Sequence, residues 1–464
     1  MKYIFAFFFF FVVTKVVAQN CNCGDNFSFM VQHIKKNYVG YADKVSKYNQ
    51  KKFEYFTDSL QKTADKTESN KCISVCKTWL NFFKDQHITV AFNENNPKEE
   101  IMDFFSSNEK TDWTEDKLKT YLSAYKIKTD NIEGIWSNSN NSRTYGIVRD
   151  SLKKDNFIGF IIKGDGIFWI PQQIKFNIIK TKKNYEFKTF LAKDHSNYNS
   201  KITIDRDTVE FTGLGKLYKN DIPKNQSFGL LNPRFKKLDS KTSLVSIPSF
   251  AFALKKEIDS LMIKNDSILK DTEHLIIDVR NNPGGSASAF EKILPYLYTN
   301  PILTEGAQML VTDDNIKDGY ERLISLVSDD EKERYKNKIL KLKAHIGELY
   351  LHYPVDTIKY NNILKNPSRV SILINKESVS SAELFILQAK QSTKVKLYGT
   401  NSSGSINYLE RVETQMPCKF FTLIYPPVRL LRADREKANE GIKPDVEIPA
   451  DVKDWIKFVR DHKL

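Results

Sequence analysis

Hydrophobic spacing divides the chain into a helical first part, a middle of short strands, and a last part in which helices and strands alternate. Apolar residues such as Met30 and Ile34 recur at helical spacing over 25–85, and a second helical stretch covers 98–126. From 132 to about 217, short alternating runs are separated by turn residues. Regular short strands of this kind predict a small antiparallel barrel or sandwich.

Two tryptophans in the middle part, Trp136 and Trp169, would fill the interior or the mouth of such a barrel. A barrel of this size can hold an apolar ligand or a peptide. A packed core is the use of the two tryptophans that we expect.

The last part has the pattern of an α/β domain. A strand at 243–247, a helix at 250–264 and a largely apolar strand at 274–279 follow one another, and a further helix is expected at 287–298. The apolar strand is of the buried parallel type. Strands that alternate with helices predict an α/β fold.

A charged segment, 314–350, interrupts this alternation and carries one apolar stripe. The stripe predicts helices, which would form either a lid over a functional site or a solvated helical hairpin.

The length of 464 residues exceeds that of one ordinary domain. The predicted fold class is therefore an α/β core within a multi-domain α+β chain. The predicted segments are a signal peptide (1–18), an N-terminal helical region (19–130), a small antiparallel β domain (131–219), a linker (220–235), the core (236–450) with a helical insert (314–350), and a C-terminal tail (451–464).

The first residues have the features of a secretory signal. Lys2 precedes an apolar run at 4–13, and small residues end in Ala18 at a suitable cleavage site. The run is too short to span a bilayer, and Lys15 interrupts it. Asn20, just before the first cysteine, argues against a lipid anchor. We expect export to the periplasm, cell envelope or exterior, with no integral membrane span.

Composition adds little beyond a globular class, with 41% hydrophobic and 28% charged residues. The formal net charge is +14, but the lysines are dispersed and no basic run with interleaved aromatics occurs. A solvated lysine-rich surface explains this charge, and nucleic-acid binding is not expected.

The five cysteines fit an exported protein, in which disulfides are permitted. Cys72 and Cys76 share one helix face at i, i+4, so bridges from Cys21 and Cys23 to this pair would fasten the N-terminus to a helix. A four-thiolate zinc site is the less favoured alternative, so no metal is expected. Cys418 is left as a buried free thiol.

The stretch 370–404 contains the most informative local pattern. A short strand at 370–374 ends in a turn that presents Ser378, Ser380 and Ser381 before a helical pattern at 382–391, and a strand at 395–398 follows. A hydroxyl at a helix N-terminus lies beside backbone N–H groups that favour developing negative charge. The alternative is that these serines only cap the helix.

Three motifs in the last part occur in the order found in one family of peptidases. They are HLIIDVRNNPGGSASAF at 274–290, ILINKESVSSAELF at 372–385 and EGIKPDVEIP at 440–449. Together they resemble the carboxyl-terminal processing peptidases and the tricorn core, serine peptidase family forty-one. The resemblance covers 236–449 and implies a spiral core of the ClpP/crotonase type.

A further element, DQHIT at 85–89, looks like a segment that precedes the core in exported bacteroidete-like members of this family. The predicted β domain stands where many members carry a PDZ domain. It shows no carboxylate-binding loop of the PDZ kind.

The resemblance also implies roles for individual residues. Glu383 matches the glutamate of the family's Ser-Ala-x-Glu segment, which makes Ser380 the nucleophile. Ser381 would offer its backbone N–H to an oxyanion hole. The turn Gly284–Gly285 would supply the second donor, because glycine lets the backbone approach a substrate closely.

The general base departs from the family pattern. The lysine expected in the loop after the strand at 395–398 is replaced by Ser405, whose hydroxyl cannot deprotonate another serine near neutral pH. His87 is the remaining candidate base, and Glu440 is the candidate carboxylate that orients it.

The sequence therefore predicts an exported serine endopeptidase that acts on a polypeptide substrate through an acyl-enzyme on Ser380, without metal or cofactor. One alternative is a degraded homologue that binds a peptide or an apolar ligand. Another is a structural or envelope protein in which the β domain is the functional part.

Overall fold

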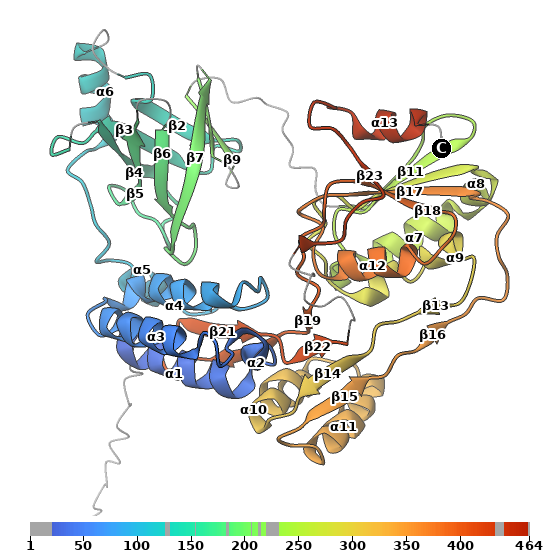
Figure 1. Ribbon diagram of the computed structural model, residues 1–464. Coiled ribbons are helices and arrows are strands. Elements are labelled where there is room, and N and C mark those ends of the chain that lie inside the picture. Colours follow the sequence, from blue (N-terminus) through green and yellow to red (C-terminus); the bar gives the residue numbers. More distant parts are fainter. Residues whose placement is uncertain are drawn as a thin grey trace, which may run out of the picture.

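The computed structural model describes residues 21–125, 130–153, 155–181, 185–205, 207–211, 215–219, 232–431 and 440–462. The predicted signal peptide and most of the predicted linker lie outside these ranges. Figure 1 shows a layer of blue helices, a cyan-to-green barrel above it, and a yellow-to-red α/β part beside both. In the part of the chain that the structure describes, no helix has the length and apolar character needed to cross a membrane.

The N-terminal helices form where the hydrophobic spacing predicts them. Their bounds are α1 Cys23–Asn37, α2 Tyr41–Lys44, α3 Gln50–Ala64, α4 Cys72–Leu80, α5 Lys98–Phe104 and α6 Glu115–Ala124. Trp79 is fully buried, and its ring lies 5.5 Å from that of Phe53, centroid to centroid. The Trp79 indole N–H donates to Thr57 Oγ1 at 2.9 Å, which satisfies a polar group that burial would otherwise leave unpaired.

A hairpin from the far end of the chain completes the N-terminal part. β1 Thr89–Phe92 pairs antiparallel with β21 Phe421–Tyr425, which pairs with β20 Val412–Gln415. In Figure 1, red β21 lies among the blue helices. The segment predicted as one core, 236–450, therefore sends a hairpin into the N-terminal part.

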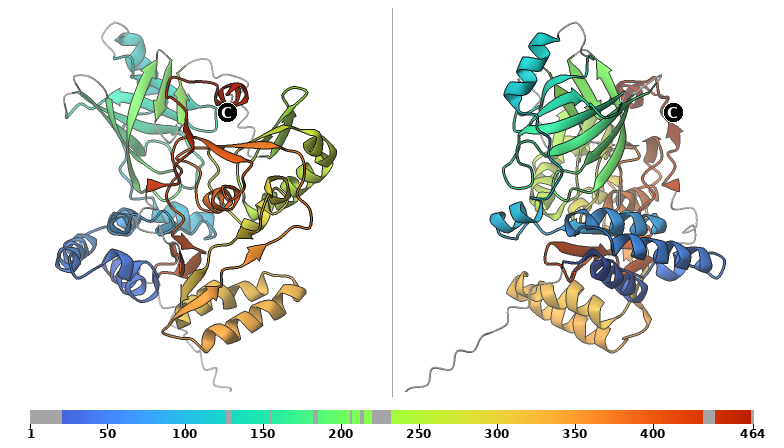
Figure 2. Two further views of the ribbon diagram at one scale, coloured as in Figure 1. Left: turned by 45° about the vertical axis from the view of Figure 1, so that its right-hand side comes forward. Right: turned by 90° about the vertical axis from the view of Figure 1, so that its left-hand side faces the viewer.

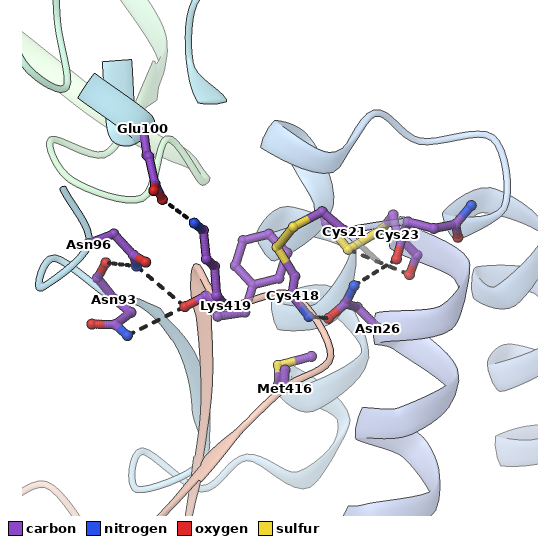
Figure 3. The surroundings of a disulfide bond; sticks show 12 residues. Cys21, Cys23, Asn26, Asn93, Asn96, Glu100, Met416, Cys418 and Lys419 are labelled. Carbon is purple, nitrogen blue, oxygen red and sulfur yellow. Dashed lines mark hydrogen bonds and ion pairs between the residues drawn. A yellow bond between two sulfur atoms is a disulfide. The ribbon is translucent and has the colours of Figure 1, made fainter. Parts of the chain in front are cut away.

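Of the two disulfides, Cys23–Cys72 agrees with the predicted pairing and Cys21–Cys418 does not. Cys21 is bonded to Cys418 and Cys23 to Cys72, whereas Cys76 is a buried free thiol. The prediction of a free Cys418 is wrong because β21 carries the preceding turn to the start of α1. Figure 3 shows this junction, in which the Cys418 amide also donates to Asn26 Oδ1 at 2.9 Å.

The middle part is a closed barrel of eight antiparallel strands, as expected of a barrel or sandwich. The strands are β2 Gly134–Asn138, β3 Thr144–Arg149, β4 Asn156–Lys163, β5 Ile174–Lys180, β6 Tyr185–Phe190, β7 Asn197–Asp205, β8 Thr208–Phe211 and β9 Gly215–Tyr218. Trp136 and Trp169 belong to its buried apolar cluster. Helix α6 covers the outside through Leu118, which packs against Val148 and Phe160.

The last part is built on a six-stranded sheet of order β10-β11-β12-β17-β18-β23. Its strands are β10 Arg234–Lys237, β11 Thr242–Ser246, β12 His274–Asp278, β17 Arg369–Ile374, β18 Val395–Gly399 and β23 Val446–Glu447. Every neighbouring pair is parallel except β10 with β11. The predicted α/β class is confirmed. β10 begins at Arg234, within the last two residues of the predicted linker.

Helices cover both faces of this sheet. Packed on one face are α7 Lys255–Lys264, α8 Asp266–Asp271, α9 Leu294–Leu297 and α12 Ser381–Ala389. Helix α13 Trp455–Asp461 covers the other face through Val459. The helix predicted at 287–298 is instead a 3-10 turn, Ala287–Phe290, followed by the short α9. Pro295 accounts for the difference, since its missing N–H is tolerated in the first turn of α9 but would remove a hydrogen bond inside one continuous helix.

The charged insert, for which a lid and a solvated hairpin were the alternatives, forms helices that pack on a sheet of their own. Helices α10 Asp313–Ile316 and α11 Asp329–Lys343 pack on a separate sheet made by β14 Ala307–Leu310, β15 Leu349–Tyr353, β19 Tyr408–Leu409 and β22 Val428–Leu430. Figures 1 and 2 show the insert below the blue helices. Leu384 and Leu387 of α12 pack against the apolar cluster to which the insert belongs. The Thr312 hydroxyl donates to Asn37 Oδ1 at 2.6 Å, which joins this part to α1.

Removing the long-range disulfide should destabilise the protein. The Cys21–Cys418 bond joins residues 397 apart in sequence. The double variant Cys21→Ala/Cys418→Ala should therefore lower the free energy of unfolding by about 2–5 kcal/mol, measured by urea denaturation. Peptide mapping without reduction should recover the Cys21–Cys418 pair. A recovered Cys21–Cys76 pair would contradict the fold of this junction.

Candidate active site

The site forms where β12 and β17 end side by side. These strands pair in parallel, so the segments that follow them leave the sheet at the same edge. The amides of Asn281 and Asn375 fasten the two exits: the Asn281 backbone N–H donates to Asn375 Oδ1 at 2.9 Å, and Asn375 Nδ2 donates to Asn281 Oδ1 at 2.8 Å. The buried Ser378 hydroxyl donates to the Val279 carbonyl at 2.8 Å. The serine turn is thus held against the glycine turn.

Ser380 occupies the N-cap position of α12 with a φ of 55° and a ψ of −115°. A positive φ in a residue with a side chain is strained and persists only where its surroundings enforce it. The cap interpretation and the nucleophile interpretation are therefore compatible. The strand, sharp turn and helix place the Ser380 hydroxyl at the helix N-terminus, where the sequence predicted it.

Glu383, in the first turn of α12, is fully buried, and both of its carboxylate oxygens accept hydrogen bonds. Its Oε1 accepts from Ser402 Oγ at 2.6 Å and from the Gly404 amide at 2.8 Å. Its Oε2 accepts from the amide and the hydroxyl of Ser405, both at 3.0 Å, and from the Ser380 amide at 3.3 Å. This carboxylate therefore binds the Ser380 turn to the loop that follows β18.

The Gly284–Gly285 turn lies directly against the serine turn. A Cβ on Gly284 would be 2.7 Å from the Val379 carbonyl oxygen, and one on Gly285 would be 2.2 Å from that of Phe250, so only glycine fits at both positions. The Ser381 hydroxyl donates to the Gly285 carbonyl at 2.5 Å.

Two backbone N–H groups beside this turn are available for a ligand. The Gly284 amide already donates to Asn282 Oδ1 at 2.9 Å. Within the described residues, no hydrogen bond is found for the amides of Gly285 and Ser381. Of the two glycines predicted as donors, Gly285 therefore has the free N–H.

His87 lies in the turn that leads into β1. Its Nδ1 and its backbone N–H both face Asp85 Oδ1, at 3.1 and 2.9 Å, and the Tyr38 hydroxyl donates to Asp85 Oδ2 at 2.8 Å. Asp85 is nearly buried, whereas the His87 side chain is 20% exposed. A histidine fixed through Nδ1 leaves Nε2 as the atom for proton transfer.

The turn containing His87 adjoins the loop held by Glu383. Gln86 Nε2 donates to Ser403 Oγ at 2.9 Å, and a cavity of about 190 Å³ separates Asp85 and Gln86 from Gly404 and Ser405. No hydrogen bond between His87 and Ser380 occurs among the residues that the structure describes. The structure thus places the His87 turn beside the loop that Glu383 binds, but neither His87 nor Ser380 is among the residues that line this cavity.

Glu440 lies on the opposite side of the same loop. Its backbone carbonyl accepts from Asn401 Nδ2 at 2.9 Å, while its side chain is exposed. The carboxylate on the His87 ring is that of Asp85, which stands two residues before it in the DQHIT motif. The spacing of two residues between Asp85 and His87 is the signal in the sequence that could have indicated this contact. Across the described ranges, no group of three or more histidine, cysteine or acidic side chains is arranged to hold a metal.

Comparison with known families agrees with this geometry. The model of peptidase family S41 matches residues 241–448, which hold the glycine turn, the serine turn and the Glu383 network. Residues 241–448 belong to peptidase family S41. The S41 domain includes Ser380, Ser405 and Glu440, whereas Asp85 and His87 lie outside the matched residues.

Individual relatives are more distant. A probable CtpA-like serine protease of Staphylococcus epidermidis is 25% identical over 222 residues, 47% of this chain and 36% of that protein. An uncharacterized protein of Chlamydia muridarum is 25% identical over 207 residues, 38% of this chain and 34% of that protein. Each match spans about a third of the relative's length.

Among solved structures, mature CPAF complexed with lactacystin has 13% identity and a TM-score of 0.47, with 92% of this chain and 94% of that chain covered. The photosystem II D1 C-terminal processing protease has 10% identity and a TM-score of 0.39, with 93% and 94% covered.

Substituting Glu383 should loosen the loop after β18. Glu383→Gln replaces one accepting oxygen by an amide N–H, which leaves buried donors without a partner. We expect a loss of about 1–3 kcal/mol in the free energy of unfolding, measured by chemical denaturation. The amides of Gly404 and Ser405 should also exchange hydrogen faster. Glu377→Gln, on an exposed side chain of the preceding turn, serves as the control and should change neither quantity.

Proposed function

We propose that this protein is an exported serine endopeptidase whose nucleophile is Ser380. The observation that supports this most strongly is the strained Ser380 turn, held against Gly285 with the free amides of Gly285 and Ser381 beside it. Such a pair of amides suits the negative charge that develops on a carbonyl oxygen during acyl transfer.

In the proposed mechanism, Ser380 Oγ attacks the carbonyl carbon of a peptide bond and its proton passes to His87 Nε2. The carbonyl oxygen becomes an oxyanion that accepts from the amides of Gly285 and Ser381. Collapse of this intermediate breaks the C–N bond, and the leaving amine takes the proton from His87. Water then attacks the acyl-enzyme by the same route in reverse.

The proposal requires His87 to reach the Ser380 hydroxyl in the substrate complex, since a general base must lie within about 3 Å of the proton that it takes. The Gln86–Ser403 bond keeps the His87 turn beside the loop that follows β18, which Glu383 joins to the Ser380 turn. Asp85 fixes the orientation of the His87 ring. Ser405, at the position where relatives carry a lysine, is buried and bonded to Glu383, so it does not serve as the base.

The two disulfides support export, because such bonds persist in oxidising compartments. The proposed destination is the periplasm, the cell envelope or the exterior, and the proposed substrate is a polypeptide. The alternative function is that of a homologue without activity that binds a peptide or an apolar ligand. The lack of contact between His87 and Ser380 favours this alternative.

Labelling with a fluorophosphonate separates the two functions. A competent serine nucleophile should attack the reagent, so the full-length protein should become labelled and Ser380→Ala should not. Ser59→Ala, an exposed serine of α3, is the control and should label like the unaltered chain. Absence of Ser380-dependent labelling in folded protein would favour the binding function.

Variants around His87 identify the base and its orienting group. His87→Ala should slow labelling by about 100-fold or more, the usual contribution of general-base catalysis. The bond to His87 Nδ1 favours Asp85 as the orienting carboxylate, whereas the sequence-based hypothesis assigns this role to Glu440. If Asp85 orients the ring, Asp85→Asn should slow labelling far more than Glu440→Gln. The reverse order would support Glu440, and an unchanged rate in His87→Ala would remove His87 as the base.

A further inference from the structure

The barrel contains a cavity that the proposed peptidase site does not use. Its volume is about 130 Å³, several times what a single water needs. Its lining residues include three phenylalanines from different strands, namely Phe176 of β5, Phe187 of β6 and Phe211 of β8. Two basic side chains, Lys175 and Arg143, also line it. Such a cavity, mostly apolar with a few converging polar groups, is typical of small-molecule sites.

A β-bulge turns Lys175 into this cavity. Phe160 of β4 pairs with Ile174, but the preceding Gly159 pairs with Phe176, so Lys175 is an extra residue in β5. Without the bulge, alternation along the strand would place Lys175 and Phe176 on opposite faces. Both instead line the cavity. Bulges often re-aim a side chain at a functional site.

The Lys175 ammonium is enclosed without a counter-charge. The residue is 7% exposed, and Nζ donates to the Phe190 carbonyl and lies 4.0 Å from the centre of the Trp169 ring. Within the described residues, Lys175 forms no ion pair with a carboxylate. Desolvation by burial lowers the pKa of Lys175 well below its usual value. A buried cation in this setting costs free energy unless an anion compensates it.

Nearby carboxylates are already engaged by other cations. Asp165 pairs with Arg143 at 2.9 Å and also accepts three backbone N–H groups. Asp194 pairs with Lys77 of α4 at 2.5 Å. His195, the other ionisable neighbour, is stacked on Trp169 at 3.8 Å, and burial lowers its pKa to about 3, so it is neutral at pH 7. The cavity therefore holds an amine whose protonated form has no carboxylate partner among the described residues, so a bound anion would favour that form.

We propose that the barrel binds a small monocarboxylate with an apolar body. The carboxylate accepts from Lys175 Nζ, and the apolar body lies against Phe176, Phe187 and Phe211. This site is independent of the Ser380 chemistry, since none of the residues that line the barrel cavity belongs to the candidate active site.

Phenylacetate and its uncharged isostere phenylacetamide test the proposal on the intact protein by isothermal titration calorimetry. Phenylacetate should bind about tenfold or more tightly than phenylacetamide, as expected of a hydrogen bond to a charged group. Binding should also change tryptophan fluorescence through Trp169, and Trp169→Phe should remove that change. Equal affinity for the two compounds, or no binding of phenylacetate at millimolar concentration, would overturn the proposal.

Lys175→Met keeps the length of the side chain but removes its charge, and should abolish the preference for phenylacetate. Lys188→Met removes a charge from the exposed face of β6 and should leave the affinity unchanged. Removing an uncompensated buried charge should not harm folding. If Lys175→Met nevertheless failed to fold, the two ligands on the unaltered protein together with Trp169→Phe would still decide the matter. Retained preference in folded Lys175→Met would contradict the assignment.

Discussion

The arrangement of the candidate active site depends on one buried carboxylate. Glu383 is the only acidic side chain that accepts from both the Ser380 turn and the loop at 402–405 within the described residues. A buried carboxylate costs free energy unless donors surround it, and here backbone amides and hydroxyls do so. The same bonds give Ser405, which stands where the family pattern predicts a lysine, a hydrogen-bond partner for both its amide and its hydroxyl. The site is preorganised around an anion.

A second constraint brings the His87 turn to this loop. β1, which follows His87 directly, pairs with β21, and the disulfide from Cys21 to Cys418 fastens the adjoining turn to α1. The candidate base is therefore positioned by residues that lie more than three hundred positions away in sequence. The barrel joins the same helices through the Lys77–Asp194 ion pair.

Local pattern predicted most of the elements but few of the long-range contacts. The strands of the barrel and of the parallel sheet were predictable because apolar alternation and apolar runs have a direct physical cause in burial. The position of Ser380 was predictable because the strand, turn and helix are contiguous. The pairing of β1 with β21, and hence the partner of Cys418, was not, since no local signal marks a contact of that sequence separation. Asp85 was not predicted as the partner of His87, because Glu440, the first residue of the EGIKPDVEIP motif, was the predicted orienting carboxylate. The bulge at Lys175 was invisible for a different reason, because a single extra residue leaves the apolar pattern of β5 almost unchanged.

The pairing of β1 with β21 also determines how late in protein synthesis the N-terminal part can finish folding. Ribosomes add residues at roughly 5–20 per second, and domains usually fold in the order in which they emerge. Here the first helices are made early, but the sheet they pack against is incomplete until residue 425 has been synthesised. The turn that carries His87 therefore reaches its final position only after almost the whole chain has been synthesised. A truncated or nascent polypeptide that already contains Ser380 lacks the scaffold for its candidate base, so the candidate nucleophile is made before His87 can take up its position.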